Sequence, residues 1–217
     1  MRRIVFIGAC LWAACGALSA TPAFTLYGTG FNNSGTLLIT AGAIDGNFTL
    51  TVNPDSTDTN AYLVDSSAFP LGAGPWVPDN ANSGWIGLAS AQSSGVAGTY
   101  TYQETFDLTG LDPTTAQITG QFAADNRVEM FLNGVDTGSG VVGFAALVPF
   151  SINSGFQAGL NTISFAVVND PGASPNPTGL RVEIDSATAQ LTPEPASFGF
   201  MGLGLAAIGI VGRRLRS

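Results

Sequence analysis

The sequence contains no histidine and no lysine, and both of its cysteines, Cys10 and Cys15, lie within the first fifteen residues. The rest of the chain therefore has neither a thiol nor an imidazole. These absences exclude a disulfide framework, a Cys or His nucleophile system, a Ser-His-Asp triad and a zinc site of the usual nitrogen and sulfur type. Carboxylates are the catalytic groups that remain.

Positive charge is scarce between the two ends of the chain. Five of the seven arginines lie at the termini, and from Thr21 to Pro193 there are fourteen acidic side chains against only Arg127 and Arg181, a formal charge of −12. Such a surface repels phosphate backbones, so nucleic-acid binding is not expected. It is compatible with neutral sugars, divalent cations or basic partners. The 217 residues suffice for one ordinary domain plus targeting segments.

The N-terminus has the pattern of a secretory signal peptide. Arg2 and Arg3 are followed by an apolar run from Ile4 to about Leu18 and then by small residues. We therefore predict a signal peptide over residues 1–23, with cleavage near 19–23, and export by the Sec route.

The C-terminus carries an uncharged segment of 17 residues, 196–212, followed by Arg213, Arg214 and Arg216. As a helix it would span roughly 26 Å, against about 30 Å for the hydrocarbon core of a bilayer. This pattern predicts a transmembrane helix whose arginines are retained on the cytoplasmic side, as the N-terminal arginines would be. A buried core helix is the alternative, and the uniform apolarity and basic stop disfavour it. Both ends thus place the acidic middle outside the cytoplasm.

The triplet Pro193-Glu194-Pro195, the apolar helix after it and the basic tail together resemble the PEP-CTERM sorting signal of Gram-negative bacteria. The resemblance covers about residues 192–217. It implies recognition by an exosortase, an integral membrane enzyme, after transient anchoring in the inner membrane. It also implies a final site at the cell surface or outside the cell, in association with exopolysaccharide and biofilm.

Short runs of alternating or β-branched residues, broken by Gly, Asn, Asp and Pro, fill residues 24–191. They predict an all-β fold, an antiparallel β-sandwich or jelly roll, flanked by the signal-peptide helix and the transmembrane helix. The predicted strands are Leu37–Thr40, Asn47–Val52, Ala61–Val64, Thr99–Leu108, Ala116–Ala123, Val128–Leu132, Thr162–Val168 and Leu180–Ile184. The Asn133-Gly134 pair after one strand suits a tight hairpin turn with positive φ.

The order of these segments is similar to that of the galactose-binding-like jelly rolls that accompany glycosidases. The segments are YTYQETFDL (100–108), FAADNRVEMFLNG (122–134), PFSI (149–152), GLNTISFAVVN (159–169) and GLRVEI (179–184). The resemblance covers roughly Trp85 to Leu191 and implies a carbohydrate-binding-like fold. Its motifs describe strands and turns, and no ligand residue of that family is carried over to this sequence.

Among the acidic residues, Glu104 stands out because it falls on the aromatic side of its strand, between Tyr102 and Phe106. A buried, protonated acid there would be a functional candidate. The alternative, favoured because lone carboxylates are rarely buried, is that the strand bulges or that Glu104 lies at an exposed end. Alternation predicts that Glu129, Glu183 and Asp185 face solvent.

Two further groups of residues are candidates for ligand contact. Asp55, Asp58 and Asp65 supply the hard oxygen ligands that calcium prefers, although an ordinary polar loop explains them too. Trp76 lies in a Pro- and Gly-rich loop that would display it to a sugar, whereas Trp85 is expected to begin a strand and pack inward. For both tryptophans, structural packing is the favoured interpretation, because large aromatic side chains are mostly core material.

The sequence as a whole predicts a secreted envelope or extracellular-matrix protein, sorted through its C-terminal signal, non-enzymatic and in contact with exopolysaccharide. No cofactor other than the calcium considered above is expected. Two alternatives stay open: a glycan-cleaving enzyme that uses two carboxylates, and a self-associating structural matrix protein.

Overall fold

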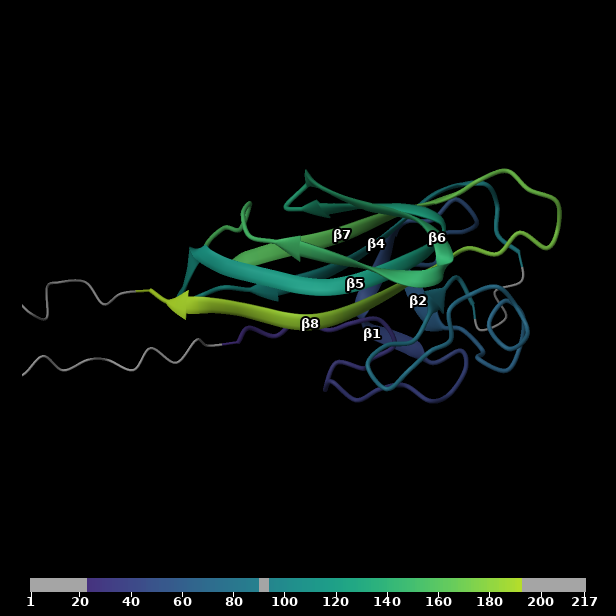
Figure 1. Cartoon of the computed structure of the whole chain (residues 1–217), viewed down its shortest axis with the longest axis horizontal. Coiled ribbons are helices and arrows are strands. Elements are labelled where there is room, and N and C mark those ends of the chain that lie inside the picture. Colours follow the sequence, from purple (N-terminus) through teal and green to yellow (C-terminus); the bar gives the residue numbers. More distant parts are fainter. Residues whose placement is uncertain (1–22, 90–93, 193–217) are drawn as a thin grey trace, which may run out of the picture.

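The computed structural model describes residues 23–89 and 94–192, and within these residues every regular element is a β-strand (Figure 1). The strands are β1 (Ile44–Val52), β2 (Asn60–Leu63), β3 (Ile86–Gly87), β4 (Gly98–Asp107), β5 (Leu111–Leu132), β6 (Val135–Ile152), β7 (Leu160–Asn169) and β8 (Gly179–Leu191). All pairings between them are antiparallel. The prediction of an all-β antiparallel sandwich is confirmed.

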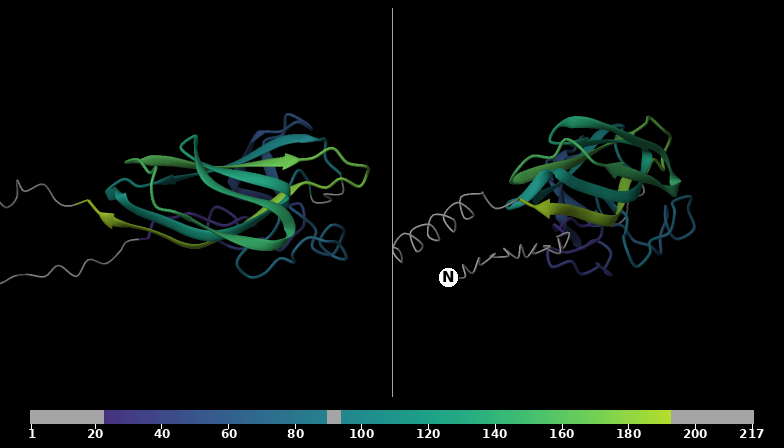
Figure 2. Two further views of the ribbon diagram at one scale, coloured as in Figure 1. Left: turned by 45° about the horizontal axis from the view of Figure 1, so that its top comes forward. Right: turned by 60° about the vertical axis from the view of Figure 1, so that its left-hand side comes forward.

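The sheet closes on itself because β5 has two partners on its inner side. Its residues up to Asp125 pair with β8, and its residues from Arg127 onward pair with β7. One layer therefore contains β1, β4, β7 and the end of β5, and the other contains β8 and the beginning of β5, while β2 and β3 complete the ring. β6 pairs only with β5 and lies outside this ring. Figure 2 shows the strands running along the long axis of the molecule.

The core lies between the two layers and follows the alternation along the strands. On β4, Tyr100, Tyr102 and Phe106 are buried, while the residues between them are more exposed, apart from Glu104 on the buried face. β7 repeats the pattern with Ile163, Phe165 and Val167 on its buried face. These side chains belong to one cluster that joins both layers, so burial of apolar area is the main force that holds the sandwich together.

The chain before β1 extends the second layer. Ala23 forms a bridge with Thr188, and the amide of Thr29 donates to the carbonyl of Val182, so residues 23–29 run antiparallel along β8. The described chain thus begins and ends at the same end of the sandwich (Figures 1 and 2).

The strand predictions hold for β1, β2, β4, β7 and β8, with β8 extending beyond its predicted end. Two predicted strands, Ala116–Ala123 and Val128–Leu132, are parts of the single strand β5. Leu37–Thr40 was predicted as a strand, but this segment forms only an isolated bridge between Phe31 and Leu37. The hairpin turn between β5 and β6 has the predicted positive φ, 51° at Asn133 and 78° at Gly134.

The signal peptide and the apolar segment 196–212 lie outside the described residues. The described residues contain no helix that is long enough and apolar enough to cross a membrane.

Candidate functional site

The two candidate sugar-contacting tryptophans lie in the interior. Trp76 is 2% exposed and Trp85 is fully buried, and their rings stack on each other with centroids 4.1 Å apart. The indole N–H of Trp76 donates to Oδ2 of Asp125 at 2.8 Å, and that of Trp85 donates to the carbonyl of Val77 at 2.8 Å. The loop folds over the sheet and buries the ring of Trp76, so it does not display Trp76 to solvent, in agreement with the favoured packing interpretation. Inward packing of Trp85 agrees with its sequence context.

The Trp76 contact perturbs Asp125. Burial raises the pKa of this carboxyl to about 6, although the hydrogen bond from Trp76 favours its charged form. The carbonyl of Asp125 accepts a hydrogen bond from the hydroxyl of Thr178. These contacts hold the loop that carries Trp76 at the point where β5 changes layers. We therefore assign Trp76 and Trp85 a structural role.

A buried ion pair, Arg181 with Glu183, corrects a prediction from alternation. Glu183 is 4% exposed instead of facing solvent, and its Oε2 lies 3.6 Å from Nη2 of the fully buried Arg181. Burial raises the pKa of Glu183, but hydrogen bonds from Asn82, Asn80 and Ser83, together with the charge of Arg181, outweigh burial and lower it overall. The strand alternation is broken because the loop before β3 folds over this side of β8 and supplies polar partners.

The three aspartates proposed for calcium serve different local structures. Asp55 accepts hydrogen bonds from the amide of Val96 and the hydroxyl of Tyr100. Asp58 accepts a 2.7 Å bond from the hydroxyl of Tyr62, and Asp65 caps its own turn. Within the described residues, acidic side chains nowhere gather in the group of three that a metal ion would need. The three aspartates therefore do not converge on one site among the described residues. Turn formation accounts for the contacts of Asp65, whereas Asp55 is bonded to residues 41 and 45 positions away.

Glu104 is buried, contrary to the favoured expectation of a bulge or an exposed strand end. It is 5% exposed, and β4 pairs regularly with β7 on both sides of it. Its Oε1 accepts a 3.0 Å hydrogen bond from the amide of Tyr27, and its Oε2 is buried without a hydrogen-bond partner among the described residues. Burial raises the pKa of Glu104 to about 8, assisted by the nearby charge of Asp45 and opposed by the Tyr27 hydrogen bond. At neutral pH this carboxyl is therefore mostly protonated.

Glu104 lines a hollow of about 390 Å³, a volume within the range of small-molecule sites. We call it the Glu104 hollow. It lies where the pairing of β1 with β4 stops at Gln103, and the segment that runs along β8 forms its other wall. The lining residues are Thr25, Tyr27, Gly46, Asn47, Thr49, Gln103, Glu104, Thr105, Phe106 and Asp107. Most of these side chains are polar and uncharged.

Apart from Glu104, no residue of this hollow stands out in the sequence as a candidate site residue. Tyr27 precedes the first strand, in a segment with no alternation long enough to predict a strand. Asn47, Thr49 and Gln103 lie on predicted strands, but nothing in the sequence brings β1 and the segment before it to the same edge of β4. The one sequence feature that points to this hollow is the carboxylate of Glu104 on the otherwise aromatic face of β4.

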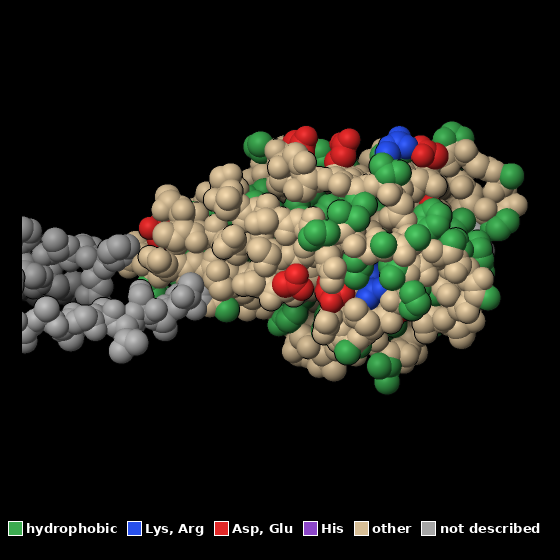
Figure 3. All heavy atoms as spheres, viewed as in Figure 1, with side chains coloured by type: hydrophobic (Ala, Val, Ile, Leu, Met, Phe, Trp, Pro, Cys, Tyr) green, Lys and Arg blue, Asp and Glu red, His purple; other side chains and the backbone are tan. Residues whose placement is uncertain are grey.

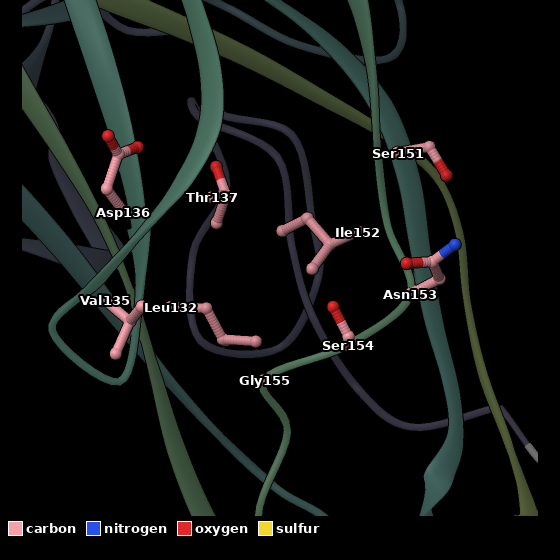
Figure 4. A pocket seen from close by; sticks show the side chains of 9 residues that line it. All are labelled: Leu132, Val135, Asp136, Thr137, Ser151, Ile152, Asn153, Ser154 and Gly155. Carbon is pink, nitrogen blue, oxygen red and sulfur yellow. The ribbon is translucent and has the colours of Figure 1, made fainter.

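A second hollow, shown in Figure 4, lies between the two ends of β6. Val135, Asp136 and Thr137 come from the start of that strand, and Ser151 and Ile152 from its end. Its volume is about 150 Å³, which corresponds to a few water molecules at about 30 Å³ each. It is thus a small gap at the open edge of the sandwich, and we assign it no ligand.

The last strand leads directly into the C-terminal segment. Leu191 still pairs with Leu111, and the amide of Thr192 donates to the carbonyl of Gly110 at 3.0 Å. The sorting residues Pro193, Glu194 and Pro195 follow at once, and they and the arginines at 213, 214 and 216 lie outside the described residues.

Comparison with protein families identifies this C-terminal segment. Residues 191–216 match the PEP-CTERM protein-sorting motif, which marks a secreted protein that is processed at the membrane. No curated protein matches the chain significantly.

Several solved structures superpose loosely on the chain. A CBM35 module from Paenibacillus barcinonensis is 11% identical with a TM-score of 0.34, and the match covers 64% of this chain and 93% of that one. A CBM4 structure is 15% identical with a TM-score of 0.30, covering 64% and 90%. A family 35 carbohydrate binding module from an environmental isolate is 18% identical with a TM-score of 0.25, covering 60% and 98%. Superpositions this loose carry no argument about the ligands of this chain.

Proposed function

We propose that this protein is a non-enzymatic component of the cell surface or extracellular matrix that contacts exopolysaccharide. It is exported by the Sec route and held in the inner membrane by residues 196–212 until an exosortase processes it at Pro193-Glu194-Pro195. The observation that carries the proposal is the sorting motif at 191–216, which begins within the last strand of a closed β-sandwich.

The chemistry of the domain supports binding more than catalysis. From residue 24 onward the sequence has no thiol and no imidazole. The face in Figure 3 consists mainly of uncharged polar groups and backbone, with acidic side chains singly or in pairs. Such a surface can hydrogen-bond to the hydroxyl groups of a polysaccharide at little desolvation cost compared with a densely charged one.

The sorting step is tested by replacing Pro193, Glu194 and Pro195 with alanine. We expect an unprocessed, membrane-held form, visible as a larger band in the membrane fraction. A substitution elsewhere in the tail, Ser217→Ala, is the control. Normal processing and release of the triple variant would refute the sorting role.

Contact with polysaccharide is tested by pull-down with immobilised neutral and acidic polymers, using residues 23–192, which contain every strand of the closed sheet. Retention on at least one polymer is expected. Absence of retention on all of them would overturn the binding role and favour a structural matrix protein. Concentration-dependent size-exclusion chromatography would then detect its self-association.

One observation favours a second candidate, a glycan-cleaving enzyme. Glu104, with its pKa raised to about 8, lines the same hollow as Asp107, whose pKa is lowered by hydrogen bonds from Thr109. An acid and a base with separated pKa values are what glycoside hydrolysis needs. However, Oε2 of Glu104 is buried, and alternation along β4 points the Asp107 side chain to the other face. Glycan hydrolysis that is lost in Glu104→Gln would establish this alternative over the binding role.

A further inference from the structure

We propose that the Glu104 hollow is the polysaccharide site of this domain and that it takes an uncharged, hydroxyl-rich saccharide. The inference rests on the proposed function and adds to it a location and a ligand class.

The hollow exists because two strand edges fail to meet. On one side of β4, all residues from Gly98 to Asp107 pair with β7, but on the other side the pairing with β1 ends at Gln103. The segment 25–27 would be the next neighbour of β4 on this side, but it runs along β8 instead. The backbone of β4 beyond Gln103 therefore borders an open space of about 390 Å³ instead of another strand.

The walls present hydrogen-bonding groups that the domain does not use. Among the described residues, the side-chain amide of Gln103 and the hydroxyls of Thr25 and Thr105 have no hydrogen-bond partner. Asn47 uses its amide N–H groups on the carbonyls of Phe31 and Asn32, which leaves its Oδ1 as a free acceptor. Neutral donors and acceptors of this kind are the complement of sugar hydroxyl groups, which both donate and accept.

Tyr27 supplies an aromatic ring in a fixed position. It is half-buried and stacks on Phe31, with centroids 6.3 Å apart and an interplanar angle of 27°. Gly35, at φ +74°, approaches the ring so closely that an added Cβ would lie 2.7 Å from one of its carbons. A ring held from two sides loses little entropy on binding, and its apolar surface beside polar groups suits a sugar ring.

The charges around the hollow select against anionic ligands. Glu104 is mostly neutral, so it adds little negative charge to the inner wall, and the side chain of the exposed Asp107 points to the other face of β4. Within the described residues, neither arginine lines this hollow, so an anionic sugar would find no counter-charge there. In a domain with a formal charge of −12, an anionic polymer is repelled, and a neutral one is not.

The test is affinity gel electrophoresis of residues 23–192 in gels containing a neutral glucan, a neutral galactomannan or alginate. The unsubstituted domain is expected to be retarded by at least one neutral polymer and less by alginate. Tyr27→Ala and Gln103→Ala should each weaken retardation, Tyr27→Ala by about tenfold in dissociation constant. Gly35→Ala should weaken it as well, because the added methyl group displaces the Tyr27 ring and strains the backbone at φ +74° without removing a polar group.

Tyr62→Ala is the matched control, because Tyr62 is also half-buried and lines a different hollow with Asp58. Circular dichroism and the melting temperature of each variant confirm folding first. If the domain binds a neutral polymer but only Tyr62→Ala weakens binding, the location is wrong while the proposed function stands. Preference for alginate overturns the ligand class, and failure to bind any polymer overturns the proposed function itself.

Discussion

The amide of Tyr27 donates a 3.0 Å hydrogen bond to Oε1 of Glu104, across 77 positions of the sequence. This bond connects the segment that runs along β8 to β4 in the opposite layer. It joins the two walls of the Glu104 hollow by a polar contact. It also fixes the carboxyl on the inner side of β4, where burial determines its protonation.

The stability of the domain should fall as the pH rises from about 5.5 to 7.5. The pKa of Glu104 is about 8 in the folded state against 4.5 ordinarily, so between these values the folded state holds a proton that the unfolded state has lost. Stability is then complete below about pH 4.5 and declines by about 1.4 kcal/mol per pH unit until the folded carboxyl ionises. The raised pKa of Asp45 and of Asp125 adds a change of the same sign at lower pH.

Urea unfolding at several pH values measures this slope, and Glu104→Gln should flatten it. Glu129→Gln, a change of the same kind at an exposed position of β5, should leave it intact. A slope that persists unchanged in Glu104→Gln would show that Glu104 is ionised in the folded protein.

Trp85→Ala should destabilise the domain by about 3–5 kcal/mol, because it removes a fully buried ring and its stacking on Trp76. Phe69→Ala, at a residue 42% exposed, should cost much less. Equal unfolding midpoints for the two variants in urea would mean that the tryptophan pair contributes little to the fold.

Arg181→Met should cost about 3–5 kcal/mol, because it leaves Glu183 buried without its counter-charge and frees the carbonyl of Pro78 and the hydroxyl of Ser83 from their donor. The other arginine of the domain offers a control. Arg127 pairs with Asp170 at the surface, so Arg127→Met should change the free energy of unfolding by only about 0–1 kcal/mol. Similar losses in the two variants would contradict the assigned difference in burial.

Calcium should not stabilise the domain through Asp55, Asp58 and Asp65, because their carboxylates are occupied with separate protein partners. A ligand that binds only the folded state raises the free energy of unfolding by about 2.7 kcal/mol at a hundred times its dissociation constant. We therefore expect the same melting temperature in calcium and in chelator. A rise in calcium that Asp58→Asn abolishes would restore the metal hypothesis.

A flexible linker inserted between Thr192 and Pro193 should speed processing of the sorting motif. The matched motif begins at Leu191, which is still paired in β8, and the Thr192 amide is bonded to Gly110. A membrane enzyme must therefore reach a motif whose first two residues are held against the folded domain. Pulse-chase measurement of the processed form tests this, with the same linker inserted after Gly134 in the β5–β6 turn as the control. An unchanged rate would show that the domain does not hinder the enzyme.

Sequence pattern predicted the fold well where strands alternate. The buried face of β4 and the turn at Asn133-Gly134 followed from local periodicity and turn chemistry. The pattern did not predict the burial of Trp76 and Glu183. Trp76 lies on a long irregular loop that packs over Glu183, and the path of this loop depends on distant contacts. The Glu104 hollow could not be predicted from the sequence either. It depends on where the pairing of β1 with β4 stops, and the side-chain pattern of β1 does not change at that point.

The bridge between Ala23 and Thr188 also has a consequence for the order of events during export. The first segment of the domain completes its pairing only with the last strand, and β8 itself joins β3 and β5. If the chain is exported N-terminus first by the proposed Sec route, it cannot close its sheet until about residue 188 has crossed the membrane. Until then the edges of β3 and β5 are unpaired, so under the proposed export route the chain would depend on rapid completion of transport, or on a chaperone, to avoid aggregation.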